Sequence, residues 1–335
     1  VKARVKAHAL KEFMNTKEKV VVMGHRLPDA DSFGAAIGIY RAAKTLNKKA
    51  YIVIDNPTSS IIPLMNTFRD NQDYEADMFV NNHEAKEIMD DNTLLVVVDT
   101  NKPSITQCED LLYMAKMIVV LDHHRQGSDT IRNSVLSYIE PYASSASEMV
   151  AEILQYFTEG IRIRNVEADS IYAGIMIDTD NFMQKTGVRT FEAAAFLRRC
   201  GADVTRVRKL FREDMNDYKA RGETIRNAEL FRGQFAISEC PSDYVDSPTV
   251  VGAQAANELL NIVGVKASFV LTEYKGVIYI SARAIDEVNV QIIMERMGGG
   301  GHLNMAGCQL ETVNMEGARN LLKSTLTEMQ DGGEI

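Results

Sequence analysis

The sequence of 335 residues contains no tryptophan and only four cysteines. The cysteines, at positions 108, 200, 240 and 308, are far apart, so they predict reduced thiols rather than a disulfide framework or a zinc site. No apolar run approaches the roughly 18 residues that a membrane-spanning helix needs. No charged segment followed by an apolar one opens the chain, as a secretion signal would. We therefore expect a cytoplasmic chain that makes no membrane contact of its own.

Positive charge is also in short supply, because 37 lysines and arginines face 46 aspartates and glutamates, a net charge of −9. An acidic surface does not suit long nucleic acid, whose binding depends on many contacts between basic side chains and phosphates. A small anionic ligand stays compatible with this charge, since a local basic pocket with metal ions can reverse the potential. At roughly 150 residues per domain, the length indicates two domains.

Four continuous apolar runs rich in β-branched residues predict strands that are buried on both faces. Helical patterns lie between the runs, so we expect an α/β domain with a parallel sheet and helices on both faces. The runs cover residues 19–24, 51–55, 93–99 and 116–122. A capping box at Ser145 and Glu148 predicts a helix that runs to about Phe157.

The C-terminal third has a different pattern. Residues 229–335 alternate short strands with helices and predict a smaller α/β domain with a mixed sheet. Residues 191–228 carry many charges on helical patterns, and we expect them to form a helical linker. The predicted N-terminal domain then covers residues 1–190.

Three apolar runs of the N-terminal domain end on side chains of the kind that bind metal ions. His25 follows the first run, Asp99 ends the third, and Asp122 ends the fourth. Ligands of open parallel sheets bind beyond the carboxyl ends of the strands. The three strand ends are therefore predicted to meet at one edge of the sheet.

More acids and imidazoles stand near these positions. They are Asp29 and Asp31 after His25, His123 and His124 after Asp122, and Asp178 in a later apolar segment. Each residue alone could have an ordinary structural role, such as a helix cap for an aspartate. Together, carboxylates and imidazoles without thiolates favour Mn²⁺, with Mg²⁺, Co²⁺ or Fe²⁺ as alternatives. Two such ions, roughly 3.5–4 Å apart, could share one carboxylate and activate a water.

A second signal lies in the C-terminal domain. Four glycines at 298–301 precede His302, and Arg283 lies near the end of an apolar run. Successive backbone N–H groups of glycines can form an anion-binding nest, and arginine binds phosphate through a bidentate fork. The same residues also fit a flexible turn and a surface ion pair, so each is weak evidence by itself.

Together these motifs resemble the DHH/DHHA1 family of phosphoesterases. The segment His25–Asp31 is similar to the first family motif, Asp99 to the second, Asp-His-His at 122–124 to the third and Ile-Asp-Thr at 177–179 to the fourth. The segment 298–307 resembles the glycine-histidine signature of the DHHA1 domain. The resemblance implies a DHH domain followed by a DHHA1 domain.

The resemblance also implies a role for each candidate residue. One metal ion would be held by His25, Asp29 and Asp99, and the other by Asp31, Asp99, His123 and Asp178. The expected catalytic residues are Asp31, Asp99, His123 and His124, while Asp122 would orient an imidazole. The expected substrate-binding residues are His124, Arg283, Gly300, Gly301 and His302.

Within the family, the segment that begins Asp29-Ala30-Asp31 is similar to GdpP-type cyclic-di-AMP phosphodiesterases. NanoRNases that also dephosphorylate phosphoadenosine phosphate often have Asp-Gly-Asp there. Manganese-dependent pyrophosphatases have a different C-terminal domain, and RecJ-type exonucleases are longer. In the GdpP type, membrane helices precede the catalytic part, and a chain that begins with valine fits such an excised fragment.

The resemblance thus implies Mn²⁺-dependent hydrolysis of cyclic-di-AMP to linear pApA, in a full-length protein anchored to the cell membrane by a segment outside this sequence. Two alternatives stay open, namely a nanoRNase and phosphoadenosine phosphate phosphatase, and a non-catalytic nucleotide sensor. The expected partner is a cyclic dinucleotide or a short linear nucleotide, without long nucleic acid. Homodimer formation also stays open.

Overall fold

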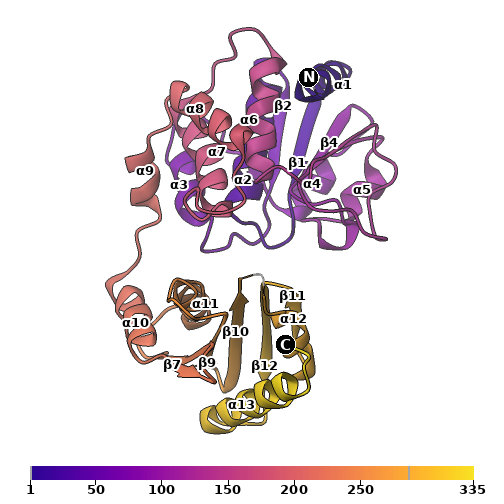
Figure 1. Ribbon diagram of the computed structural model, residues 1–335. Coiled ribbons are helices and arrows are strands. Elements are labelled where there is room, and N and C mark those ends of the chain that lie inside the picture. The colour runs from indigo at the N-terminus through magenta and orange to yellow at the C-terminus, as the bar shows by residue number, and fades with distance from the viewer. Residues whose placement is uncertain (1, 286) are drawn as a thin grey trace. The chain divides into compact units, whose positions relative to one another are not determined.

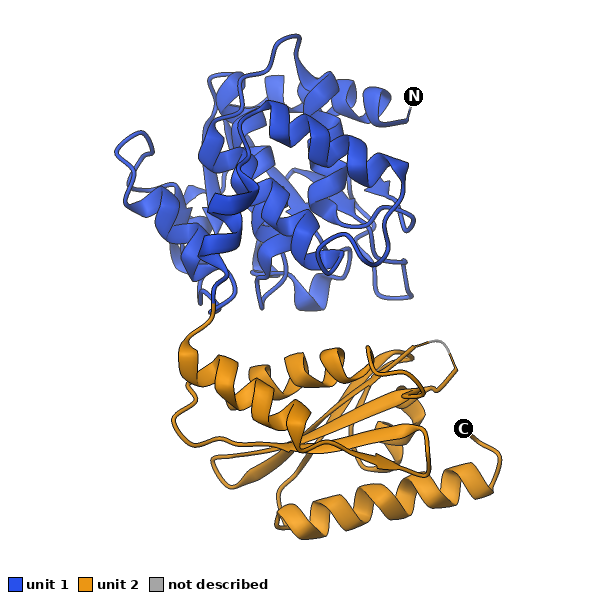
Figure 2. Ribbon diagram, turned by 60° about the vertical axis from the view of Figure 1, so that its left-hand side comes forward, with its two compact units in different colours: residues 1–212 blue, residues 213–335 orange. Residues whose placement is uncertain are grey.

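The computed structural model describes residues 2–285 and 287–335 and divides the chain into two compact units. Unit 1 ends at Arg212 and unit 2 begins at Glu213 (Figure 2). Each unit has its own six-stranded sheet and its own hydrophobic core. The predicted α/β class, with a parallel sheet first and a mixed sheet second, is confirmed. The boundaries at residues 190 and 228 stay a prediction.

The strands of the unit 1 sheet pair in parallel, in the order β3-β2-β1-β4-β5-β6 (Figure 1). They are β1 (Lys19–Met23), β2 (Lys49–Val53), β3 (Phe79–Val80), β4 (Thr93–Val98), β5 (Met117–Asp122) and β6 (Leu136–Ile139). The four predicted apolar runs form β1, β2, β4 and β5, the central strands of the sheet. The short edge strands β3 and β6 were not predicted.

Helices cover both faces of the unit 1 sheet. They are α1 (Lys2–Asn15), α2 (Ala30–Thr45), α3 (Ile62–Arg69), α4 (Asn82–Ile88), α5 (Asp110–Met114), α6 (Ala146–Phe157), α7 (Asn165–Asp178), α8 (Val188–Arg199) and α9 (Val204–Leu210), with a 3₁₀ turn at Pro103–Ile105. Val20 and Val22 of β1 pack into a core with α2, α6 and α7. Val21 and Met23 point to the opposite face and pack with α4 and α5. Burial on both faces explains why these strands are apolar at every position.

The unit 2 sheet has the order β11-β12-β10-β9-β8-β7, with β8 and β9 parallel and the other pairs antiparallel. Its elements are α10 (Met215–Arg226), β7 (Glu229–Phe231), β8 (Phe235–Cys240), α11 (Pro248–Leu259), β9 (Ala267–Tyr274), β10 (Val277–Ala284), α12 (Val290–Arg296), β11 (Gly300–His302), β12 (Met305–Leu310) and α13 (Met315–Asp331). One face packs against α12 and α13, the other against α10 and α11. Throughout the described chain, none of the helices combines the length and apolar composition of a membrane span.

Candidate metal centre

The carboxyl ends of β1, β4 and β5 lie side by side, because β4 pairs with β1 on one side and with β5 on the other. His25 stands two residues beyond β1, Asp99 directly follows β4, and Asp122 ends β5. The three strand ends therefore meet at one edge of the sheet, as the apolar runs predict. This edge collects the polar side chains of the site.

Asp99 lies between two imidazoles and is only 2% exposed. Its Oδ2 is 3.2 Å from Nε2 of His25, and its Oδ1 is 3.2 Å from Nε2 of His123. Although His123 is near, Oδ1 of Asp99 accepts no hydrogen bond from the residues that the structure describes. The backbone φ of Asp99 is 60°, a left-handed value that aspartate and asparagine tolerate better than other L-residues. The turn after β4 thus places a buried carboxylate oxygen where a cation would satisfy it.

The acids and imidazoles form three overlapping groups, and the ligand atoms within each group lie within 4.8 Å of one another. The groups are His25, Asp29 and Asp99; Asp31, His123 and Asp178; and Asp99, His123 and His124. Carboxylate oxygens and imidazole nitrogens at this spacing fit divalent cations such as Mn²⁺. Because Asp99 belongs to two groups, its carboxylate is suited to bridge two ions.

The loop after β1 leads directly into α2 and thereby fixes two aspartates. Asp29 is the N-cap of α2, and its Oδ1 accepts a hydrogen bond of 2.9 Å from the backbone N of Ser32. Its Oδ2 is 3.5 Å from Nε2 of His25. Asp31 lies in the first turn of the same helix, where its Oδ2 is 3.5 Å from Nε2 of His123. The two aspartates therefore face different histidines, as their spacing of two residues predicts.

The Asp31 carboxylate is also bound by the beginning of α6, a feature that sequence reasoning missed. The backbone N of Ala146 donates to Oδ2 at 2.8 Å, and the backbone N of Ser147 donates to Oδ1 at 2.7 Å. Backbone donors have no sequence pattern of their own. The available signal was Ser145, which caps α6 through a hydrogen bond of 3.0 Å from Glu148 N and locates the start of the helix.

Electrostatic repulsion among the acids shifts their pKa values. Burial raises the pKa of Asp31 well above its usual range, and the charges of Asp99 and Asp178 add to the effect. Burial likewise raises the pKa of Asp178 to about 6, with Asp99 and Asp29 contributing. For His25, burial opposes the charged form, but hydrogen bonds with Asp29 and Asp99 prevail and raise the pKa to about 10. A divalent cation would relieve the repulsion between these carboxylates.

Asp122 is fully buried and stands outside the three groups. Its Oδ1 accepts a hydrogen bond of 3.2 Å from the backbone N of His124 and is 2.7 Å from Nδ1 of the same residue. Its Oδ2 accepts a hydrogen bond of 2.6 Å from Nδ2 of Asn101. The bond to Asp122 raises the pKa of His124. This geometry fits the orienting role that the family resemblance implies, and it adds Asn101, which sequence reasoning did not identify.

Arg283, the predicted phosphate ligand of unit 2, lies on β10. Its Nε donates a hydrogen bond of 2.9 Å to Oδ1 of Asn257 on α11, and its Nη1 donates one of 2.9 Å to the carbonyl of Ala282. Burial lowers its pKa from the ordinary arginine value. The guanidinium is thus held in place by neutral acceptors.

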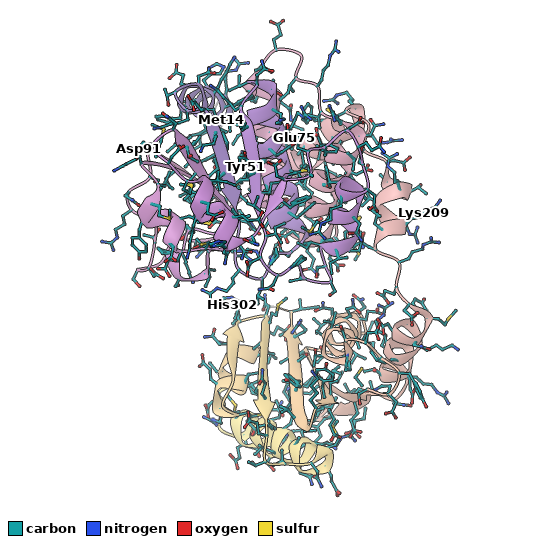
Figure 3. The ribbon with its side chains drawn as sticks, turned by 180° about the vertical axis from the view of Figure 1, so that it is seen from behind. Met14, Tyr51, Glu75, Asp91, Lys209 and His302 are labelled. Carbon is teal, nitrogen blue, oxygen red and sulfur yellow. The ribbon has the colours of Figure 1, made fainter. Side chains whose placement is uncertain are left out.

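The glycine run forms regular structure instead of the expected nest. Gly298, with φ of 88°, follows the end of α12, and Gly300–His302 form β11 at the edge of the sheet. A Cβ at Gly299 would lie 2.1 Å from the carbonyl oxygen of Gly307, so glycine permits the close approach to β12. Figure 3 shows His302 at the end of this sheet, where its side chain is exposed. Because successive N–H groups of a strand point in alternate directions, they cannot converge on one anion.

A cavity of about 460 Å³ on unit 2 adjoins this run. Its walls offer three hydroxyls and one side-chain amide, groups that can bind a polar ligand. It is lined by Thr249, Tyr279, Ile280, Ser281, Gly298, Gly299, Gly307, Cys308 and Gln309.

Comparison with known proteins agrees with this geometry. Residues 19–175 match the DHH family, N-terminal domain, and residues 235–328 match the DHHA1 domain. The chain belongs to the DHH/DHHA1 family. The family resemblance seen in the motifs is therefore confirmed.

Relatives from this family differ in how much of their length the chain covers. The chain is 43% identical to the cyclic-di-AMP phosphodiesterase GdpP of Bacillus subtilis (strain 168), over 99% of this chain but 51% of that protein, so it spans about half of its length. It is 24% identical to the bifunctional oligoribonuclease and PAP phosphatase NrnA of Thermus thermophilus, over 100% of this chain and 96% of that protein. A solved exopolyphosphatase-related protein from Bacteroides fragilis has a TM-score of 0.82 at 20% identity, over 98% of this chain and 97% of that chain, which shows a shared fold.

Proposed function

We propose that this chain is the catalytic part of a Mn²⁺-dependent phosphodiesterase that hydrolyses cyclic-di-AMP to linear pApA. The observation that carries the proposal is the set of three overlapping ligand groups around the buried carboxylate of Asp99. The identity of 43% to GdpP supports cyclic-di-AMP as the substrate. The mixture of carboxylates and imidazoles supports Mn²⁺ as the metal.

The family pattern assigns the ligands to two ions. When bound, the ions activate a water for attack on phosphorus and polarise the phosphate. Asp99 would serve both ions, because its two oxygens face the two histidines on either side. The first ion would be held by His25, Asp29 and Asp99, and the second by Asp31, Asp99, His123 and Asp178.

His124 is suited to contact the substrate phosphate. Its Nδ1 is engaged by Asp122 at 2.7 Å, so the ring is oriented and Nε2 stays available. The raised pKa favours the protonated imidazole, in which Nε2 donates a hydrogen bond. Arg283 and His302 would bind the substrate from unit 2, the arginine through its fork of N–H donors. The cavity beside the glycine run offers polar groups for the rest of a nucleotide.

The test is chromatography of the products after incubation with cyclic-di-AMP, cyclic-di-GMP, pApA and phosphoadenosine phosphate in Mn²⁺. We expect pApA from cyclic-di-AMP and no turnover by the Asp31→Ala variant, because that variant lacks a ligand of the second ion. Wild-type turnover by Asp31→Ala would contradict the assigned ligands. Activity on linear substrates alone would contradict the cyclic substrate.

A second candidate is a nanoRNase and phosphoadenosine phosphate phosphatase. The observation in its favour is that the chain covers 96% of the T. thermophilus NrnA, which is itself a bifunctional oligoribonuclease and PAP phosphatase. The two linear substrates in the test separate this candidate from the first. A nucleotide sensor would instead bind cyclic-di-AMP without metal and release no product. Dimer formation and anchoring of a longer protein to the membrane stay predictions.

A further inference from the structure

We propose that a contact between three helices, made by Gly34 of α2, Ser147 of α6 and Gly174 of α7, positions Asp31 for metal binding. None of the three residues is a candidate ligand. The inference rests on the proposed function, because it takes Asp31 as a metal ligand. It assigns a positioning role to residues of the helical layer beneath the site.

The beginning of α6 holds Asp31 from three directions. The backbone N–H groups of Ala146 and Ser147 donate to the two carboxylate oxygens, and the hydroxyl of Ser147 donates to the backbone carbonyl of Asp31 at 3.1 Å. All three residues are at most 1% exposed. The first N–H groups of a helix lack partners within the helix, and this end of a helix favours negative charge. The start of α6 therefore orients the carboxylate and offsets part of its charge, while Oδ2 stays 3.5 Å from Nε2 of His123.

Ser147 reaches Asp31 only because two glycines face it. A Cβ on Gly174 would lie 2.1 Å from Oγ and 2.9 Å from Cβ of Ser147. A Cβ on Gly34 would lie 2.7 Å from the same Oγ and 2.5 Å from the carbonyl oxygen of Ser170. Contacts this short require the neighbouring atoms to move. A side chain at either glycine would therefore displace the start of α6 from Asp31.

The contact lies about one helical turn from the ligands. On α2, Gly34 follows Asp31 by three residues, and on α7, Asp178 follows Gly174 by four residues. Residues three or four apart lie on the same face of a helix. Asp31 and Asp178 belong to one ligand group, so a shift of α6 against α2 or α7 would change the spacing of that group. The geometry points to lower metal affinity, with every ligand still present.

The test compares Gly174→Ala with Gly38→Ala by calorimetric titration with Mn²⁺, below the melting temperature of both variants. Gly38 is a matched control, since it lies on α2 one turn farther from the ligands, and its Cβ would lie 2.3 Å from Cγ1 of Val150 on α6. Both variants overcrowd the contact between α2, α6 and α7. We expect Gly174→Ala to weaken binding of one Mn²⁺ by about 10- to 100-fold, the usual effect of disturbing a group that supports a metal ligand. We expect Gly38→Ala to keep the wild-type affinity.

A second substitution serves as a rescue. Gly174→Ala combined with Ser147→Gly removes both atoms that the new Cβ would approach most closely and keeps the backbone N–H groups, so Mn²⁺ affinity should recover. Equal affinities in Gly174→Ala and Gly38→Ala would overturn the inference, as would a double variant no better than Gly174→Ala.

If Gly174→Ala does not fold, Ser147→Ala decides. Loss of the hydroxyl contact to Asp31 should weaken binding of the same Mn²⁺, and unchanged affinity would overturn the inference. A wild-type chain that binds no Mn²⁺ would instead refute the proposed function, and this inference with it. The two failures are therefore distinguished in one series of titrations.

Discussion

Among single residues, Asp178 shows what the site costs the fold when no metal is bound. Its pKa is raised from 3.8 to about 6 by burial and by neighbouring carboxylates. The folded state thus favours the protonated acid, and the contribution to stability that is present below pH 4 is lost as the pH rises through about 6. At pH 8 the ionised Asp178 therefore destabilises the metal-free protein.

The substitution Asp178→Asn removes this charge at nearly constant shape. In EDTA at pH 8, we expect it to raise the free energy of unfolding by roughly 2 kcal/mol, since each unit of pKa shift corresponds to 1.36 kcal/mol. At pH 4 the gain should largely vanish. In Mn²⁺ the order should reverse, because a ligand is lost and with it the stabilisation by binding. Thermal melts in EDTA and in Mn²⁺ check both signs, and a variant less stable than wild type in EDTA at pH 8 would contradict this account of Asp178.

Asp122 belongs to the same scale but should act on catalysis through His124. An amide at this position places a donor opposite either Nδ2 of Asn101 or Nδ1 of His124. We expect Asp122→Asn to lower kcat for cyclic-di-AMP by about 10- to 100-fold while two Mn²⁺ still bind. Steady-state kinetics and calorimetry measure the two quantities, with Asp129→Asn as a control for an exposed aspartate of the same region. Loss of one Mn²⁺ in Asp122→Asn would place Asp122 among the ligands instead.

The candidate ligands could be predicted at this scale because acids and imidazoles gather in short segments where neither packing nor helix capping requires so many of them. His25, Asp99 and Asp122 also gained from the rule that parallel strands present their ends at one edge. The support of Asp31 by Ala146 and Ser147 could not be predicted, since any residue supplies a backbone N–H and only the fold decides where it points. Asn101 was missed because a polar residue in a loop has no distinctive pattern.

At the scale of helices and strands, the position of α7 depends on a buried ion pair. Glu167 of α7 is fully buried and accepts two hydrogen bonds of 2.7 Å from Arg41 of α2. It also accepts one of 2.8 Å from the hydroxyl of Tyr74. The pair therefore joins the two helices that carry Asp31 and Asp178.

We expect Glu167→Ala to lower the free energy of unfolding by about 3–5 kcal/mol, because it leaves the Arg41 guanidinium largely buried without its partner. The matched control is Glu75→Ala, which breaks a pair of 2.8 Å between Glu75 and Lys44. That pair is solvent-exposed, so the control should cost less than about 1 kcal/mol. Urea denaturation with Mn²⁺ removed measures both. Equal costs would show that the buried pair contributes no more than an exposed one.

Elements were predictable where burial imposes a pattern. Strands β1, β2, β4 and β5 are covered on both faces and are apolar throughout, whereas β3 has two residues and β6 alternates exposed and buried positions. The glycine run was interpreted as a nest because glycine permits many backbone conformations. Its pairing with β12 depends on the distant residue Gly307, which no local pattern reveals.

For the whole molecule, the division into two units separates the proposed metal chemistry from the proposed binding of substrate. The cores of unit 1 contain residues up to Phe211, and those of unit 2 begin at Ala220. Each unit also completes its own sheet. All candidate metal ligands lie in unit 1, whereas Arg283 and His302 lie in unit 2.

A chain that ends at Arg212 is therefore expected to fold and to bind Mn²⁺ as the full chain does, because its core, its sheet and its ligand groups are complete. Its turnover of cyclic-di-AMP should fall by at least about 100-fold, since the groups proposed to bind substrate phosphate are missing. Circular dichroism melts, calorimetric titration and product chromatography measure the three properties. The full-length Arg283→Lys variant is the matched control, because a single ammonium cannot replace the bidentate fork, and it should lose part of the turnover at unchanged Mn²⁺ affinity. Full turnover by the shortened chain would mean that unit 1 alone recognises the substrate.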